Sequence, residues 1–133
     1  MGDRAVFGFR QYKQQDDPLV FLYSHWGGDA METDLRDALV AATGRWNDPD
    51  YGTRIMVSHL TRDADGDTGY GLYAGTIKTR HGGDYPYMYI VDFPAGKGQM
   101  VRSEDITAVL AETTFDDFAK NPFRLSSDLL LEV

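Results

Sequence analysis

Apolar and polar residues alternate at the start of the chain, which is the pattern of a half-buried strand. Residues 5–12 place an alanine and two phenylalanines on one face and mostly polar residues on the other. Residues 19–23 are apolar on both faces, as expected for a strand near the centre of a sheet. The polar segment between them ends in Pro18, so we expect a turn there and an antiparallel hairpin around it.

The spacing of apolar residues then becomes helical. A helix is predicted at residues 29–43, where Asp29 and Glu32 have the spacing of a capping box. Glu32 and Arg36 are expected to pair on its solvent side, because they are four residues apart. The apolar stripe of this helix consists of Met31, Leu35, Ala38, Leu39 and Ala42.

A second, shorter helix is expected to begin at Pro49. Asp48 suits the capping position before it, and proline is favoured in the first turn. The helical spacing of apolar residues continues to Leu60, although Gly52 weakens the pattern. Residues 54–60 alternatively suit a strand.

The second half of the chain reads as strands followed by short helices. Residues 70–78 and 85–93 are predicted to form a second hairpin, and residues 99–102 a short fifth strand. Ser103 is expected to cap a helix, and Thr114 to open a shorter one with Asp117 at capping-box spacing.

Runs of strands with segregated helices indicate an α+β fold. We expect a single domain over residues 1–133, with a mostly antiparallel sheet and helices packed on one face. The tail, residues 125–133, holds four leucines and a valine. It is too apolar to remain in water, so it should dock on the core or form a homo-oligomer with a second subunit.

Charge and composition limit the classes of molecule that the protein is expected to bind. The net charge of −8 disfavours nucleic acid and anionic membranes, which both require basic residues on the protein. There is no cysteine, which excludes disulfides and thiolate metal sites. No apolar run approaches the length of about 20 residues that spans a membrane, and no signal peptide is recognisable. A cytoplasmic protein is therefore expected.

The most unusual local composition stands where the second strand ends. Tyr23, His25 and Trp26 precede the paired glycines Gly27 and Gly28. Helix N-terminal N–H groups point outward at such strand-to-helix junctions, and glycine lets a ligand approach the backbone. Indole and imidazole rings can stack and hydrogen-bond. A small-ligand site is predicted here, and the alternative is a tight turn with the tryptophan in the core.

Acidic residues make this junction unfavourable for a phosphate. Asp29, Glu32 and Asp34 would occupy the first turn of the helix, where they already complement its dipole. A bound phosphate would need a basic residue from elsewhere in the chain. Arg54 is the donor that we include in the site, and the other candidates are Arg45, Arg80 and Lys97.

Two further patterns carry weaker signals. Tyr87 and Tyr89 alternate along one face of a predicted strand and could form a stacking platform, although core packing or cross-strand pairing is the first interpretation. The acidic loop 63–67 resembles the start of a calcium loop, but Thr68 and Ala74 occupy positions that require glycine and glutamate. No metal or cofactor is therefore expected.

The chain contains no P-loop, no nucleophile elbow and no zinc-protease motif. His25 could form an acid–base pair with Asp29 or Asp92, but a chain with this many carboxylates offers such pairs by chance. His81 is expected in an exposed turn, and His59 in the core.

The segment from Tyr23 to Gly28 resembles a family of small phage and prophage proteins. In that family a hairpin ends in Tyr-x-His-Trp-Asp-Gly and an amphipathic helix follows. Residues 87–92 and 114–118 also look like the family, whereas Gly27 stands where aspartate is usual. The resemblance implies a phage accessory protein that acts in the host cytoplasm.

Three functions remain open. The first is binding of a small polar ligand without catalysis, such as sequestration of a host defence signalling nucleotide. The second is an acidic protein–protein interaction or inhibitor module, which the charge and the apolar tail favour. The third is a hydrolase that depends on His25.

Overall fold

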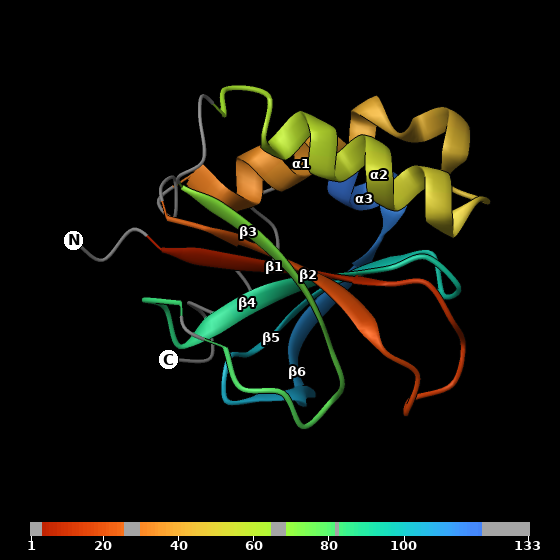
Figure 1. Cartoon of the computed structure of the whole chain (residues 1–133). Coiled ribbons are helices and arrows are strands. Elements are labelled where there is room, and N and C mark those ends of the chain that lie inside the picture. Colours follow the sequence, from red (N-terminus) through yellow and green to blue (C-terminus); the bar gives the residue numbers. More distant parts are fainter. Residues whose placement is uncertain (1–3, 26–29, 65–68, 82, 121–133) are drawn as a thin grey trace.

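Among the residues that the structure describes, six strands form one sheet, and three α-helices pack on one of its faces (Figure 1). This computed structural model describes residues 4–25, 30–64, 69–81 and 83–120. It confirms the predicted α+β class, a mostly antiparallel sheet with helices on one face. The strands are β1 (Ala5–Arg10), β2 (Leu19–Ser24), β3 (Tyr70–Gly75), β4 (Tyr87–Asp92), β5 (Lys97–Arg102) and β6 (Asp105–Thr114). The helices are α1 (Met31–Ala41), the 3₁₀ turn η2 (Thr43–Arg45), α2 (Pro49–Leu60) and α3 (Phe115–Lys120).

The sheet has the strand order β3-β2-β1-β4-β5-β6. Its two halves are antiparallel, and they meet at the parallel pair β1–β4, in which Phe7 lies opposite Tyr89. The predicted β1–β2 hairpin is confirmed. The predicted hairpin of β3 with β4 is wrong, because β3 pairs with β2 and the two strands lie on opposite sides of β1.

A crossover segment, residues 76–86, connects β3 to β4, and its described residues form no helix or strand. It crosses the sheet on the face opposite the helices, since the His81 ring lies 4.4 Å from the ring of Phe21. Gly83 then lies beside the Val6 side chain, and the Asp84 N–H donates a hydrogen bond to the Arg4 carbonyl oxygen. Phe21 and Val6 both belong to the apolar cluster on that face.

The predicted helix after Ser103 is also wrong. Residues Asp105–Thr114 form the edge strand β6, and the Ser103 hydroxyl donates a hydrogen bond to the Tyr85 carbonyl instead of capping a helix. The stretch is rich in β-branched residues, which fit a pleated strand well. The cap at Thr114 is confirmed, because its hydroxyl accepts a hydrogen bond from the Asp117 N–H.

Two apolar clusters hold the layers together. The larger one lies between the sheet and the helices, and each fully buried large side chain in it stabilises the fold by about 1.5–3 kcal/mol. It includes Phe7, Phe9, Leu22, Leu35, Leu39, Met56, Tyr89 and Val91. The smaller one lies on the other face and consists of Val6, Leu19, Phe21, Met88, Ile90, Val101 and Ile106.

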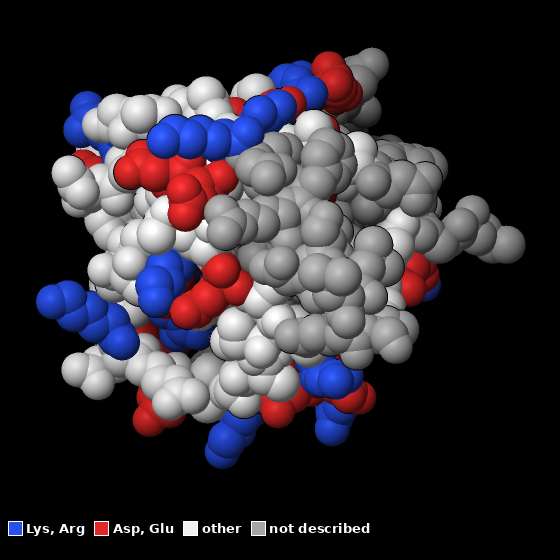
Figure 2. All heavy atoms as spheres, turned by 180° about the vertical axis from the view of Figure 1, so that it is seen from behind, with Lys and Arg blue, Asp and Glu red and all other residues white. Residues whose placement is uncertain are grey.

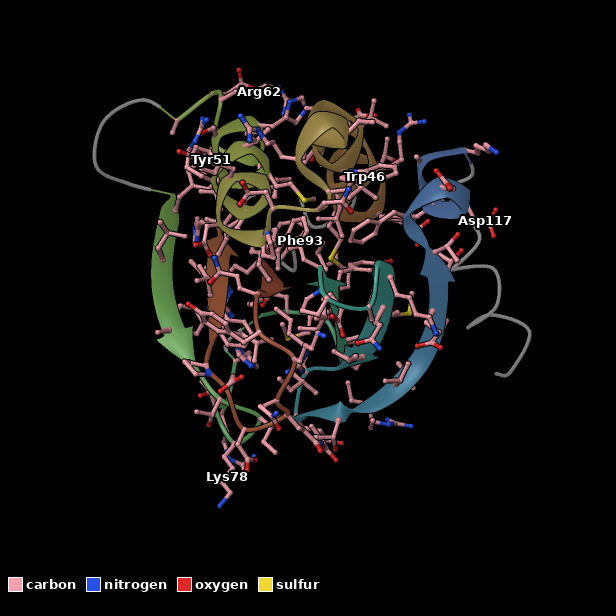
Figure 3. All side chains as sticks on the ribbon, turned by 90° about the vertical axis from the view of Figure 1, so that its right-hand side faces the viewer. Trp46, Tyr51, Arg62, Lys78, Phe93 and Asp117 are labelled. Carbon is pink, nitrogen blue, oxygen red and sulfur yellow. The ribbon has the colours of Figure 1, made fainter. Side chains whose placement is uncertain are left out.

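Helix α2 begins as predicted, with the Asp48 carboxylate accepting a hydrogen bond from the Tyr51 N–H. Its glycine, Gly52, is buried against the ring of Phe93 and the carbonyl of Arg45. Phe93 lies in the layer between the helices and the sheet (Figure 3). A glycine in this helix therefore permits close packing against the end of β4.

Candidate functional site

Four elements meet at one end of the sheet. There β1 and β4 begin, β2 ends, and the first turn of α1 packs over the strands. Ser24 pairs with Ala5. Leu22 and Tyr89 flank β1 on its two sides, so the backbones of Leu22 and Tyr89 are about 10 Å apart. We call this place the corner.

The corner contains four of the predicted site residues, namely Tyr23, His25, Tyr87 and Tyr89. Trp26, Gly27 and Gly28 lie outside the described residues. The sheet divides the four into two groups, because Tyr23 packs with the apolar cluster opposite the helices while Tyr89 lies beneath them.

A buried carboxylate forms the centre of the group beneath the helices. The Tyr89 hydroxyl donates a 2.8 Å hydrogen bond to Glu32 Oε1, and the two residues are 1% and 6% exposed. The ring of Tyr87 meets that of Tyr89 edge-on at 6.1 Å. Burial, and then the charge of Glu32, raise the pKa of Tyr87. This group can accept or donate hydrogen bonds in a largely dry environment.

The expectation that Glu32 pairs with Arg36 in solvent is wrong. Glu32 points into the core, and the Arg36 guanidinium instead contacts Asp37 at 2.6 Å. Glu32 lies one turn before Leu35 and belongs to the same apolar stripe. A charged side chain at this spacing predicts a surface position. Its hydrogen-bond partner in the structure is instead Tyr89, on the distant strand β4.

The group on the other face is more exposed. A 3.1 Å hydrogen bond joins the Tyr23 hydroxyl and His25 Nδ1. Beside them, the Arg4 guanidinium binds the Asp84 carboxylate through both Nε and Nη2. These hydrogen bonds lower the pKa of Asp84 to about 2 and, with a smaller contribution from Tyr23, raise that of Arg4. Arg4 is therefore already occupied by a carboxylate.

Arg54 makes no described contact with the corner residues. It is exposed on α2, where its guanidinium donates to the Ser58 hydroxyl at 3.4 Å. Within the described parts of the chain, no hydrogen bond, ion pair or ring contact joins it to the other predicted site residues.

His81 is not exposed as expected. In the crossover segment its ring packs on Phe21, and Nδ1 lies 2.6 Å from the Tyr73 hydroxyl. Burial lowers the pKa of His81 and raises that of Tyr73 to about 12. The neutral imidazole therefore fastens the crossover to β3.

Among the described residues, no group of three or more His, Cys, Asp or Glu side chains is arranged to hold a metal ion. In the same parts of the chain, no helix is both long and apolar enough to cross a membrane. Comparison with known proteins adds no relative: no family model, no curated protein and no solved structure matches this chain.

Proposed function

We propose that the protein binds a small polar ligand at the corner and does not catalyse a reaction. The observation that carries the proposal is the buried Glu32–Tyr89 hydrogen bond, which lies at the same end of the sheet as the Tyr23–His25 pair. Buried carboxylates and phenols are costly to keep away from water unless they are well paired. Where they line a site, they fix the orientation of a ligand by its hydrogen-bonding groups.

The charges at the corner favour a ligand that presents hydrogen-bond donors. Glu32 and Asp34 lie in the first turn of α1, and burial raises the pKa of Asp34, which indicates a poorly hydrated carboxyl group. The nearby Arg4 is held by Asp84. A nucleotide would thus enter with its base toward Glu32 and its phosphates toward solvent.

The resemblance to the phage and prophage family implies a phage accessory protein, and small phage proteins without a catalytic motif can act by sequestering a host signalling nucleotide. In this proposal the protein sequesters the nucleotide in the host cytoplasm and releases it unchanged. The absence of a catalytic motif in the sequence is consistent with sequestration.

Thermal unfolding in the presence of nucleosides, nucleotides and cyclic dinucleotides tests the proposal. A ligand at a thousand times its Kd stabilises the folded state by about 4 kcal/mol. We expect one of these compounds to raise the Tm of the wild-type protein, and Glu32→Gln and His25→Ala to remove most of that increase.

The matched control is Arg54→Gln, which should keep the full increase because no described contact joins Arg54 to the corner residues. Mass spectrometry of the small molecules released by heating protein purified from host lysate gives an independent readout. The proposal fails if no nucleoside or nucleotide is released and none raises the Tm.

A protein partner at the edge strand β3 is the second candidate. β3 carries no charged residue, Leu72 is 61% exposed, and no described strand pairs with its outer edge. Native edge strands usually carry charges that prevent further strand pairing, and such an open edge can accept a strand from a partner. Leu72→Lys should abolish capture of a host protein and leave the nucleotide response unchanged.

A further inference from the structure

A groove of about 250 Å³ lies at the opposite end of β1 from the corner. Its lining includes Arg10 and Asp92, which face each other at the ends of β1 and β4. Lys13 from the β1–β2 turn and Gln99 of β5 also line it. Arg10 follows Phe9 of the helix-side core, so its side chain points to the face opposite the helices.

Arg10 is a cation that is mostly removed from water. Its side chain is 14% exposed, and its nearest carboxylate oxygen, Asp92 Oδ2, lies 3.6 Å from Nε. That distance is too long for a hydrogen bond. A guanidinium has five N–H donors, yet no described protein group accepts a hydrogen bond from the Arg10 side chain, and its Nη1 is buried without such a partner.

The contrast with Arg4 shows what is unusual. Arg4 is more exposed, and it still makes three side-chain hydrogen bonds to Asp84. Asp92 does not satisfy Arg10 in the same way, because its Oδ2 lies 3.6 Å from Arg10 Nε and its Oδ1 accepts the Ala95 N–H of the following turn. The donors of Arg10 are therefore left for an acceptor that comes from outside the fold.

We propose that this groove binds a small monocarboxylate. A planar carboxylate matches the guanidinium through two parallel hydrogen bonds. The lining contains two positive charges, from Arg10 and Lys13, and one negative charge, from Asp92, which suits a single negative charge better than a phosphate dianion. Ile106 and the exposed Val109 supply an apolar wall for a short alkyl chain.

The charges of the lining disfavour a polyanion, because Asp92 offsets one of the two cations. Acidic and basic side chains lie next to one another on the described part of the surface seen in Figure 2, so this side of the molecule presents no extended positive patch. The carboxylate could belong to a free short-chain acid or to the C-terminus of a peptide, and these two sources share the same chemistry.

Two-dimensional ¹H–¹⁵N NMR titration of the whole chain with butyrate tests the proposal. Saturable shifts are expected for the amides of Lys13, Gln99 and Thr107. Arg10→Gln should weaken binding by about tenfold or more, because it removes hydrogen bonds to a charged group. Arg54→Gln, which changes the net charge equally, should bind as the wild-type protein does.

Lys13→Gln is the second test variant, for use if the Arg10 variant does not fold. Lys13 is exposed, so the fold should not need it, and binding should weaken by about two- to fivefold. A dipeptide with a free C-terminus and the same dipeptide with an amidated C-terminus distinguish the two sources. Tighter binding of the free dipeptide than of butyrate identifies a peptide C-terminus, and weaker binding identifies a free acid.

The proposal is overturned if no carboxylate gives saturable shifts, if Arg10→Gln binds butyrate as well as the wild-type protein does, or if inorganic phosphate binds as tightly as butyrate. Neither the nucleotide response at the corner nor its failure bears on these outcomes, because the two sites share no residue.

Discussion

Replacement of Gly52 by alanine should destabilise the protein, although alanine normally stabilises a helix interior by about 1 kcal/mol relative to glycine. A Cβ atom at Gly52 would lie 2.6 Å from Phe93 Cε1 and 2.9 Å from the Arg45 carbonyl oxygen. The second contact involves backbone, so a side-chain rotation cannot relieve it. Overpacking costs about 1–3 kcal/mol. Because the backbone contact cannot relax, we expect about 2–3 kcal/mol here, which leaves a net loss of about 1–2 kcal/mol after the gain in helix propensity.

Urea denaturation and thermal melting followed by circular dichroism measure this loss. For a chain of this length, the expected change corresponds to a decrease in Tm of about 3–8 °C. Gly44→Ala is the matched control, because a Cβ atom there meets nothing within 4 Å and Gly44 does not have a positive φ. It should be neutral or slightly stabilising. The packing argument is refuted if Gly52→Ala is as stable as the wild-type protein or more stable.

Three other predictions follow from buried or paired side chains. Tyr89→Phe removes the hydrogen bond to Glu32 and should lower the free energy of unfolding by about 1.5–3 kcal/mol in urea titrations. Arg4 lowers the pKa of Asp84 to about 2, so the ion pair stabilises the folded state fully above the unfolded-state pKa of about 3.9, and this stabilisation is lost as the pH falls toward 2. Thermal melts should show that the difference in stability between the wild-type protein and Asp84→Asn shrinks over that pH interval. Burial lowers the pKa of His81 below its unfolded value of about 6.5. As the pH drops below that value, the unfolded chain takes up the proton first, so the folded state loses stability. His81→Gln should therefore reduce the change in Tm between pH 8 and pH 5.

Local sequence signals predicted the elements better than their partners. The alternation before Arg10 and the Asp48–Pro49 pair identified β1 and α2, because strand period and helix capping depend on neighbouring residues. The pairing of β3 with β2 could not be predicted in this way. The crossover at residues 76–86 has the glycine and polar content of a hairpin turn, and only tertiary contacts such as that of His81 with Phe21 distinguish the two.

The site shows the same limit. Tyr23 and His25 are close in the sequence, and the structure places them in contact. The burial of Glu32 cannot be predicted from its neighbours in the sequence, because it depends on Tyr89, which stands 57 positions away in the chain. Arg10 carried no signal at all, since an arginine at the end of a strand is usually exposed and its surroundings come from β4, β5 and β6.

The parallel pairing of β1 with β4 has a consequence for how the molecule assembles. Each half of the sheet is built from antiparallel neighbours, whereas the parallel pair between the halves joins the strands that lie farthest apart in the sequence among the strand pairs of the described sheet. Because the loop that β1–β4 pairing must close is the longest, this pairing costs the most chain entropy and should form late in folding. A chain cleaved within residues 76–86 would keep the strand neighbours of each half, so the two fragments should recombine along the β1–β4 line into a native-like complex.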